Sequence, residues 1–381
     1  MLESSEGRTR TCDLRVMSPT SYHCSTSRFE RQMYLNYVTH TSPVLVKIKT
    51  PIRNVFRLST FKEDAFSFVL TPVFIPTFTL RATHLEENKE HHSGFISIIG
   101  NPNVGKSTLM NALIGTDLSI ITSKAQTTRH RILGIVNGPN YQMVLSDTPG
   151  VIKPAYEMQQ SMMNFVKEAL VDADVLIYMV TVEETELKDE KLFAKLKKAK
   201  APLFVLINKI DLSSQEIVEK TVAYWQELFP NARVCPIAAL NGFFIPELLG
   251  LLISLLPPAP PYFPKDQLTD KPERFFVNEA IREQILQRYD KEIPYSVEVI
   301  TEEFYEQPNI IKIRSVILVE RETQKGILIG HRGGALKQVG IGARKTLQEF
   351  FGKKIHLELY VKIAKNWRSN TKQLKRFGYN N

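Results

Sequence analysis

A glycine-rich octapeptide, GNPNVGKS, carries the clearest chemical signal in this sequence. It fits the pattern G-x-x-x-x-G-K-[ST] of a phosphate-binding P-loop, between an apolar run at residues 95–99 and a helical segment at residues 108–114. Glycines let backbone N–H groups point at phosphate oxygens, and the helix start adds partial positive charge. We expect Lys106 to reach the β- and γ-phosphates and act in catalysis, and the Ser107 hydroxyl to bind Mg²⁺. The predicted nucleotide-binding residues are Gly100, Asn101, Pro102, Asn103, Val104, Gly105, Lys106 and Ser107.

A polar, basic and threonine-rich stretch at residues 119–131 lies where a P-loop protein places a switch loop. In such a loop a threonine closes on Mg²⁺ and the γ-phosphate. Thr127 and Thr128 are both candidates for this metal-binding and catalytic role, and their chemistry does not choose between them. An ordinary surface loop is the alternative interpretation.

A second phosphate-sensing signal follows at the end of a predicted strand. In nucleotide switches a D-x-x-G sequence places its aspartate beside Mg²⁺, and the glycine N–H senses the γ-phosphate. The predicted residues are Asp147, Thr148, Pro149 and Gly150, with Asp147 near the metal and Gly150 in the catalytic group. Val151 comes next, where Ras-like enzymes carry a glutamine that orients the attacking water. Because valine cannot hydrogen-bond to water, switch-loop backbone, a second water, a monovalent cation or a partner must orient it, and we expect slow intrinsic turnover.

The sequence Asn208-Lys209-Ile210-Asp211 indicates which purine is bound. The Asp211 carboxylate can accept two hydrogen bonds, from guanine N1–H and from its 2-amino group. Adenine lacks that pair of donors, and a site built this way discriminates strongly. We expect the Lys209 stem to cover the base and Asn208 to tie this loop to the P-loop. A last loop is expected to contact guanine O6 through a backbone N–H assigned to Ala239, within Ala238, Ala239 and Leu240.

These motifs need a scaffold that brings loops from distant parts of the chain together. The pattern predicts strands and helices in alternation, which gives an α/β P-loop fold with a doubly wound, mostly parallel sheet and the ligand at the carboxyl ends of its strands. The strands are expected at 95–99, 132–136, 141–145, 175–180, 203–207 and 233–237, and the helices at 108–114, 158–171, 189–200 and 245–256.

The C-terminal part carries a different signal, a G-x-x-G sequence with basic residues at its two central positions. We expect it between an apolar strand at 327–329 and a helix that ends at 351, in the order helix, strand, strand, G-x-x-G, helix, strand. The first helix is expected from 273 to 292–296. This is the α+β arrangement of a type II KH domain, whose G-x-x-G clamps single-stranded RNA. The predicted RNA-binding residues are Gly330, His331, Arg332, Gly333 and Lys337; taken alone, the sequence would be read as a turn.

Charge supports a nucleic-acid partner. Residues 331–381 hold twelve Lys and Arg against Glu349 and Glu358, a net +10, whereas the whole chain carries +9. A basic region of this density is the electrostatic footprint of phosphate binding, and an idle basic terminus is the alternative. Trp367 could stack on a base or pack on the sheet.

The rest of the chain gives weaker indications. Its 381 residues suggest two or three domains, and its three cysteines share no metal-ligand spacing, which favours a reducing compartment. Residues 1–92 do not resemble a domain. They are interpreted as a mis-annotated start or a disordered tail, with a transit peptide as one alternative and a short membrane-associating segment at 65–80 as another.

The order GNPNVGKS, QTTRHR, DTPG, NKID and AAL resembles the TrmE–Era–EngA–Septin-like GTPases, and KAQTTRHRI with TQKGILIGHRGGALKQVG resembles the Era family in particular. The resemblance implies an Era-type GTPase (G) domain at 93–260, a proline-rich linker at 261–272 that acts as a stiff spacer, and a KH type II domain with a basic tail at 273–381. It implies a GTPase with GTP or GDP as ligand and Mg²⁺. The implied function is binding of 16S ribosomal RNA near its 3′ end and support of small (30S) ribosomal subunit biogenesis.

The resemblance also implies a cytoplasmic protein that can lie peripherally on the cytoplasmic face of the inner membrane, and a mitochondrial one only if the N-terminal stretch is a transit peptide. No protein partner is identifiable and a monomer is expected. Two alternatives stay open: a membrane-associated regulatory GTPase whose basic tail binds anionic lipid, and an assembly factor with little GTP turnover.

Overall fold

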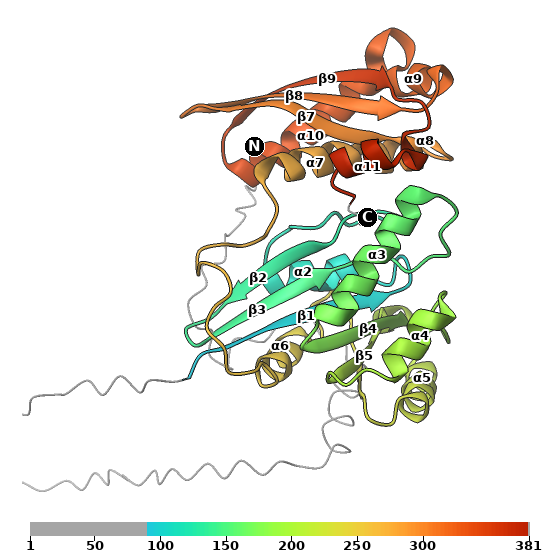
Figure 1. Ribbon diagram of the computed structural model, residues 1–381, viewed down its shortest axis with the longest axis vertical. Coiled ribbons are helices and arrows are strands. Elements are labelled where there is room, and N and C mark those ends of the chain that lie inside the picture. Colours follow the sequence, from blue (N-terminus) through green and yellow to red (C-terminus); the bar gives the residue numbers. More distant parts are fainter. Residues whose placement is uncertain (1–89, 380–381) are drawn as a thin grey trace, which may run out of the picture. The chain divides into compact units, whose positions relative to one another are not determined.

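The computed structural model describes residues 90–379, so the expected N-terminal extension lies outside the described residues except at its end. A six-stranded sheet comes first, in the order β2-β3-β1-β4-β5-β6, and β2 alone runs antiparallel to its neighbour (Figure 1). The strands are β1 (His92–Gly100), β2 (Ile132–Asn137), β3 (Tyr141–Asp147), β4 (Val175–Thr181), β5 (Leu203–Asn208) and β6 (Arg233–Pro236). Continuous burial along β1, β3, β4 and β5 explains their apolar runs, because parallel strands are covered on both faces.

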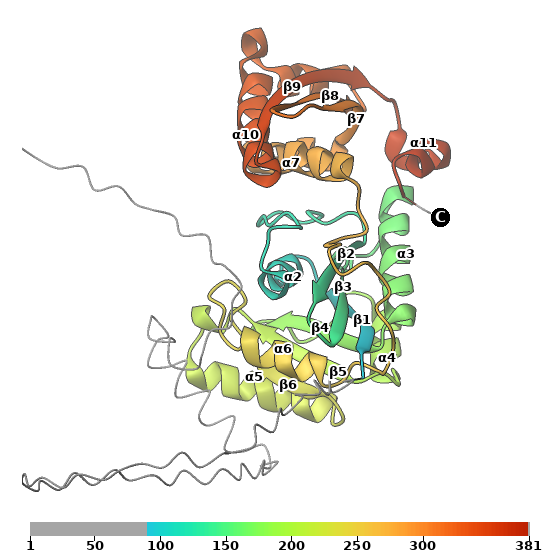
Figure 2. The ribbon, with the colours of Figure 1, turned by 90° about the vertical axis from the view of Figure 1, so that its left-hand side faces the viewer.

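Helices cover both faces of this sheet, with α3 on one side and α2 and α6 on the other (Figure 2). The helices are α2 (Lys106–Ile114), α3 (Glu157–Asp172), α4 (Glu190–Lys197), α5 (Gln215–Leu228) and α6 (Ile245–Ile253). The sequence analysis assigned no element to α5, which buries only Val218 and Trp225 and so has a sparse apolar pattern. The helix predicted at 189–200 is longer than the observed α4, which spans Glu190–Lys197. The Asp189 carboxylate caps the start of α4 by accepting from the backbone N–H groups of Lys191 and Leu192.

The C-terminal part has its own three-stranded sheet, β7-β8-β9, in which β8 pairs antiparallel with β7 and parallel with β9. A separate buried core lies between this sheet and the helices α7 and α10. Its elements are α7 (Glu273–Arg288), α8 (Ile293–Ser296), β7 (Glu298–Glu306), β8 (Ile310–Val319), α9 (Glu322–Ile329), α10 (Gly334–Phe351), β9 (Lys354–Ile363) and α11 (Thr371–Arg376).

Two expectations about this part were wrong. The first helix ends at Arg288, and the residues expected to prolong it form the separate short helix α8. The apolar residues before the G-x-x-G sequence are the end of α9, so the loop joins two helices. The run is short enough to fit either structure, and Gln324 favours the helix because its side-chain oxygen accepts from the backbone N–H groups of Glu320 and Arg321 at the helix start, at 3.0 and 3.1 Å.

The proline-rich linker is not a free spacer. The Gln142 side chain of β3 accepts from the backbone N–H groups of Tyr262 and Phe263 at 2.7 and 2.9 Å. Further along, the Ile135 N–H donates to the Leu268 carbonyl at 2.8 Å, and Gly134 forms a bridge with Thr269. The linker therefore lies along the free edge of β2 and satisfies backbone groups that an edge strand exposes.

Residues 90–379 contain no helix with both the length and the apolar character needed to cross a bilayer.

Candidate functional site

The P-loop connects β1 to α2 and depends on two glycines. Gly105 has φ +104°, and a Cβ on it would lie 2.3 Å from the Asn208 side-chain nitrogen. A Cβ on Gly100 would lie 2.3 Å from the Met179 carbonyl oxygen. Real side chains do not allow such contacts, so the loop can follow this path only with glycine at both positions.

Lys106 lies inside the loop, where its ammonium donates to the carbonyls of Gly100 at 3.2 Å and Asn101 at 2.9 Å. Burial lowers the pKa of Lys106 to about 8, although the charge of Asp147 opposes this. A buried ammonium with only two carbonyl partners is well suited to an anionic ligand, because a phosphate stabilises its charge directly.

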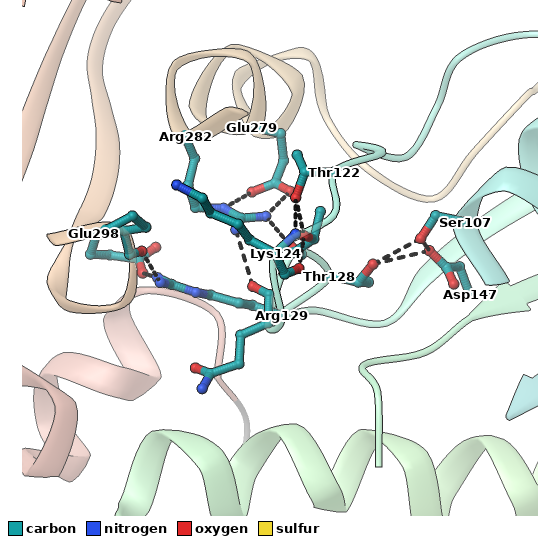
Figure 3. Close-up of polar contacts among 12 residues, drawn as sticks. Ser107, Thr122, Lys124, Thr128, Arg129, Asp147, Glu279, Arg282 and Glu298 are labelled. Atoms are coloured by element: carbon teal, nitrogen blue, oxygen red, sulfur yellow. Dashed lines mark hydrogen bonds and ion pairs between the residues drawn. The ribbon is translucent and has the colours of Figure 1, made fainter. Parts of the chain in front are cut away.

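Three side-chain oxygens from three different segments meet beside the P-loop (Figure 3). Ser107 Oγ lies 2.7 Å from Asp147 Oδ2 and 3.0 Å from Thr128 Oγ1, and Thr128 Oγ1 lies 3.4 Å from the same carboxylate oxygen. The other oxygen, Asp147 Oδ1, is buried and has no hydrogen-bond partner among residues 90–379. Burial raises the pKa of Asp147. This set of hard oxygen donors around a desolvated carboxylate fits Mg²⁺.

The geometry separates the two candidate threonines. Thr128 belongs to the oxygen group described above, whereas Thr127 Oγ1 lies 2.6 Å from both Thr122 Oγ1 and the Lys124 carbonyl, inside its own loop. The structure therefore places Thr128, and not Thr127, beside Ser107 and Asp147.

A cavity of about 520 Å³ extends from the P-loop to the predicted base-binding loop, and Lys209, Asp211 and Leu240 are part of its lining. As expected, Asn208 ties the loops together, since its amide donates to the Val104 carbonyl at 2.8 Å. The Asn208 Oδ1 also accepts from the Ala239 N–H at 2.9 Å. That N–H is therefore paired within the protein, and its contact with guanine O6 stays a prediction.

Val151 is completely buried, and its N–H donates to the Gly100 carbonyl at 3.1 Å. Its side chain belongs to the core and does not face the cavity, which agrees with the expectation that something else orients the attacking water.

The G-x-x-G loop between α9 and α10 places its basic residues outward. His331, Arg332 and Lys337 are exposed. Gly330, Arg332 and Gly333 all have positive φ, at 71°, 49° and 77°, and a Cβ on Gly330 would lie 2.6 Å from the Ala335 Cβ. The tight backbone lifts the two central side chains into solvent, where phosphate groups can reach them.

Trp367 does not offer a stacking surface. It is fully buried, and its indole N–H donates to the Ser296 carbonyl at 3.0 Å. The packing interpretation is correct and the base-stacking one is wrong, because a buried ring has no open face.

Known proteins resemble both parts of the chain. The model of the 50S ribosome-binding GTPase family matches residues 95–209, and that of the KH domain matches residues 292–368. The GTPase Era of Geotalea uraniireducens is 42% identical over 293 residues, which are 76% of this chain and 99% of that protein. The GTPase Era of Lacticaseibacillus paracasei is also 42% identical and is covered to 98%.

The chain belongs to the Era family of GTPases.

Solved structures of this family agree. Era in complex with MgGDPNP and nucleotides 1506–1542 of 16S ribosomal RNA has a TM-score of 0.73 at 37% identity, covering 76% of this chain and 99% of that one. An Aquifex aeolicus Era variant bound to GDP·AlF₄⁻ gives the same values. The predicted P-loop G domain, KH domain and GTP hydrolysis are thereby confirmed, and so is the implied family. The roles of single residues and the domain boundaries stay predictions.

The sequence analysis missed a buried polar cluster that joins the switch loop to the KH domain (Figure 3). Arg129, 1% exposed, donates to the carbonyls of Val297 at 2.7 Å and Pro294 at 2.8 Å, and lies 3.4 Å from Glu298. In the opposite direction, Arg282 of α7 donates to the carbonyls of Thr127 and Gln126. The available signal was the basic run Arg129-His130-Arg131 after the threonines, which the sequence analysis included in the predicted switch loop without assigning it a contact.

Proposed function

We propose that this protein is a GTP-dependent assembly factor of the small ribosomal subunit whose KH domain holds 16S ribosomal RNA near its 3′ end. The support is a family relative solved with that RNA, together with the exposed His331 and Arg332 of the G-x-x-G loop. Helix α10 continues the same surface with exposed Lys337, Arg344 and Lys345. Backbone access through Gly330 and Gly333 and positive charge next to it are the features that a single-stranded RNA clamp needs.

Ser107, Thr128 and Asp147 would hold the Mg²⁺ that accompanies GTP, and Lys106 would contact the phosphates. Such a metal ion would stabilise the negative charge on the phosphates during transfer. Gly150 follows β3, and we expect its N–H to sense the γ-phosphate. Intrinsic hydrolysis is slow, because the buried Val151 offers no group to the attacking water. Single-turnover hydrolysis tests this point, and a complete lack of turnover would instead favour a factor that has lost its catalysis.

Two arginines, one from the switch loop and one from the KH domain, each hydrogen-bond to the other part of the protein. These contacts are the observation that supports coupling between the nucleotide state and RNA binding. Arg129 reaches from the switch loop into the KH domain, and Arg282 reaches back to the carbonyl of Thr127. Thr128 lies between these two contact points and belongs to the metal group. A ligand shifts an equilibrium only by its different affinity for the two states. Thr128 would supply such a difference if its contact with the metal depended on a γ-phosphate that orders the loop.

Equilibrium RNA binding by the full chain tests the proposal with GDPNP, with GDP and without nucleotide. We expect about tenfold tighter binding with GDPNP than with GDP, since coupling energies are typically 1–3 kcal/mol. Arg129→Ala is expected to bring the three affinities together, and Arg274→Ala, which contacts only carbonyls within the KH domain, is the matched control. Equal affinity of the natural chain in all three states would refute the coupling.

Binding to anionic vesicles in the absence of RNA tests the alternative of a membrane-associated GTPase. We expect the protein to stay mainly in the cytoplasmic fraction and to bind RNA more tightly than vesicles of phosphatidylglycerol at the same ionic strength. The opposite ranking would favour lipid as the partner of the basic tail.

A further inference from the structure

The last residues of the chain form a segment that the KH-domain family does not include. The family model ends at residue 368, but the described chain continues through α11 to Tyr379. Leu374 and Tyr379 are both fully buried. Gly378 has φ +86°, and the Tyr379 N–H donates to the Leu374 carbonyl at 3.0 Å, so the backbone turns back at the end of α11 and carries the tyrosine inward.

Tyr379 lies against the switch loop of the G domain. Its ring centroid is 4.4 Å from that of His130, and its hydroxyl donates to Glu298 at 3.1 Å. The same carboxylate lies 3.4 Å from Arg129. A single side chain therefore contacts His130 directly and reaches Arg129 through one carboxylate.

His130 is held from several elements. Besides Tyr379, its ring lies 6.1 Å from Phe165 of α3 and 5.8 Å from Phe275 of α7, measured between centroids. Aromatic rings at such spacings attract one another at preferred angles. The residue two positions after Thr128 is thus fixed by rings from the G domain, the KH domain and the chain end.

The position of His130 constrains Thr128, because two residues span at most about 7 Å of extended chain. Thr128 Oγ1 lies 3.0 Å from Ser107 Oγ and 3.4 Å from Asp147 Oδ2. A shift of His130 can therefore be transmitted to Thr128 and change its distance from this oxygen group.

Arg368, the last residue of the KH-domain match, contacts the residues after the second phosphate-sensing loop. Its guanidinium lies 5.0 Å from the ring centroid of Tyr156, the residue that precedes α3, and it also pairs with Glu320. Arg368 and Tyr379 thus contact the chain beyond Gly150 and Thr128, respectively. Burying the Glu298 carboxylate costs free energy. A segment that served packing alone would not need to place the Tyr379 hydroxyl on this buried carboxylate.

We propose that Tyr379 is a positioning residue for GTP hydrolysis, and that its contacts with His130 and Glu298 hold Thr128 at the metal site. It touches neither nucleotide nor metal. The inference rests on the GTPase activity of the family and on the assignment of Thr128, and it does not require RNA binding.

The test compares the full-length chain with Tyr379→Ala, with Tyr379→Phe and with the control Tyr360→Ala, whose ring is 48% exposed on β9. We expect Tyr379→Ala to lower kcat and to raise the Mg²⁺ concentration for half-maximal GDPNP binding, each about tenfold. GDP affinity should stay within twofold of the natural chain, because GDP has no γ-phosphate to order Thr128. Tyr379→Phe keeps the ring, so its kcat and its Mg²⁺ requirement should lie between those of the natural chain and of Tyr379→Ala. The control Tyr360→Ala should match the natural chain in both.

Thermal unfolding separates positioning from a merely structural role. A variant that loses GDP and GDPNP affinity equally, together with a lower midpoint of unfolding, would overturn the proposal, and so would an unchanged GDPNP-to-GDP affinity ratio. If Tyr379→Ala does not fold, Tyr379→Phe decides: an Mg²⁺ requirement for GDPNP equal to that of the natural chain would then refute a role for the hydroxyl contact with Glu298. Failure of RNA binding in any variant would concern the proposed function and leave this result intact.

Discussion

At the scale of single residues, the site is built from side chains that each satisfy two segments at once. Asn208 donates to the P-loop and accepts from the last loop, so one amide fixes the distance between phosphate and base recognition. Lys209 has φ +62°, which turns its side chain back to donate to the Asn103 carbonyl at 2.8 Å. Such conformations are uncommon for lysine and occur where the surroundings determine them.

Glu298 provides a pH-dependent test at this scale. It is 7% exposed, and burial raises its pKa to about 7 even though the charge of Arg129 opposes the shift. Because the folded-state pKa lies above the unfolded-state value, this group stabilises the protein fully below about pH 4.5, and that contribution is lost as the pH rises towards 7. Glu298→Gln removes the titration. We expect its free energy of unfolding, relative to the natural chain, to increase by up to about 3 kcal/mol between pH 5 and pH 8.

Urea unfolding at both pH values measures this difference. Glu302→Gln is the control, since Glu302 lies on the same strand but is exposed and pairs with Lys362 at the surface. A difference between variant and natural chain that does not change with pH would show that Glu298 is ionised throughout this range.

At the scale of elements, the linker differs most from its expected role. A proline-rich stretch is stiff and extended, which fits a spacer, but residues 257–271 lie along β1, β2 and β3 of the G domain. Strand β2 begins directly after Arg131, so the linker is attached to the strand that leaves the switch loop. Two sets of contacts therefore connect that loop to the KH domain, the arginines and the linker.

Gln142→Ala tests the attachment of the linker. The buried Gln142 side chain bonds the backbone of Tyr262 and Phe263 and also the Phe263 carbonyl at 2.8 Å. Loss of these bonds leaves backbone groups of the linker unpaired. We expect about 2–3 kcal/mol lower stability in urea unfolding and faster proteolysis between residues 257 and 271. Gln160→Ala, in which only a contact within α3 is removed, should show neither effect.

At the scale of the whole molecule, the residues from Glu90 onward form one compact unit, yet two separate cores stabilise it. The KH core is made by α7, α10 and the sheet β7-β8-β9 without G-domain residues. Contacts between the two parts include buried charges, which are weak sources of stability but specific in geometry.

A fragment of residues 272–381 should therefore fold and bind RNA without responding to nucleotide. Its affinity is expected to fall within about tenfold of that of the full chain with GDPNP, because the exposed G-x-x-G loop and α10 are all retained, and coupling energies are of this size. In the full chain, Lys106→Ala should abolish nucleotide binding. Fluorescence anisotropy with a labelled single-stranded RNA measures the RNA affinity of the fragment and of the full chain, and the same method with a labelled guanine nucleotide measures nucleotide binding by Lys106→Ala. The fragment carrying Arg332→Glu is the control for specific RNA binding. A folded fragment with no affinity for RNA would refute the modular organisation.

The sequence by itself determined the chemistry of this protein: the P-loop, the D-x-x-G, the N-K-x-D and the G-x-x-G each specify a ligand group through residue types at fixed local spacing, and apolar periodicity was enough for most strands and helices. It failed where local pattern is ambiguous, as in α5 and in the helix before the G-x-x-G loop. The tertiary structure alone decided which threonine meets Ser107 and Asp147, where the linker lies, and how Arg129, Arg282 and Tyr379 join the two domains. The arginine contacts connect residues more than 150 positions apart, and a local sequence pattern does not encode a contact that only folding creates.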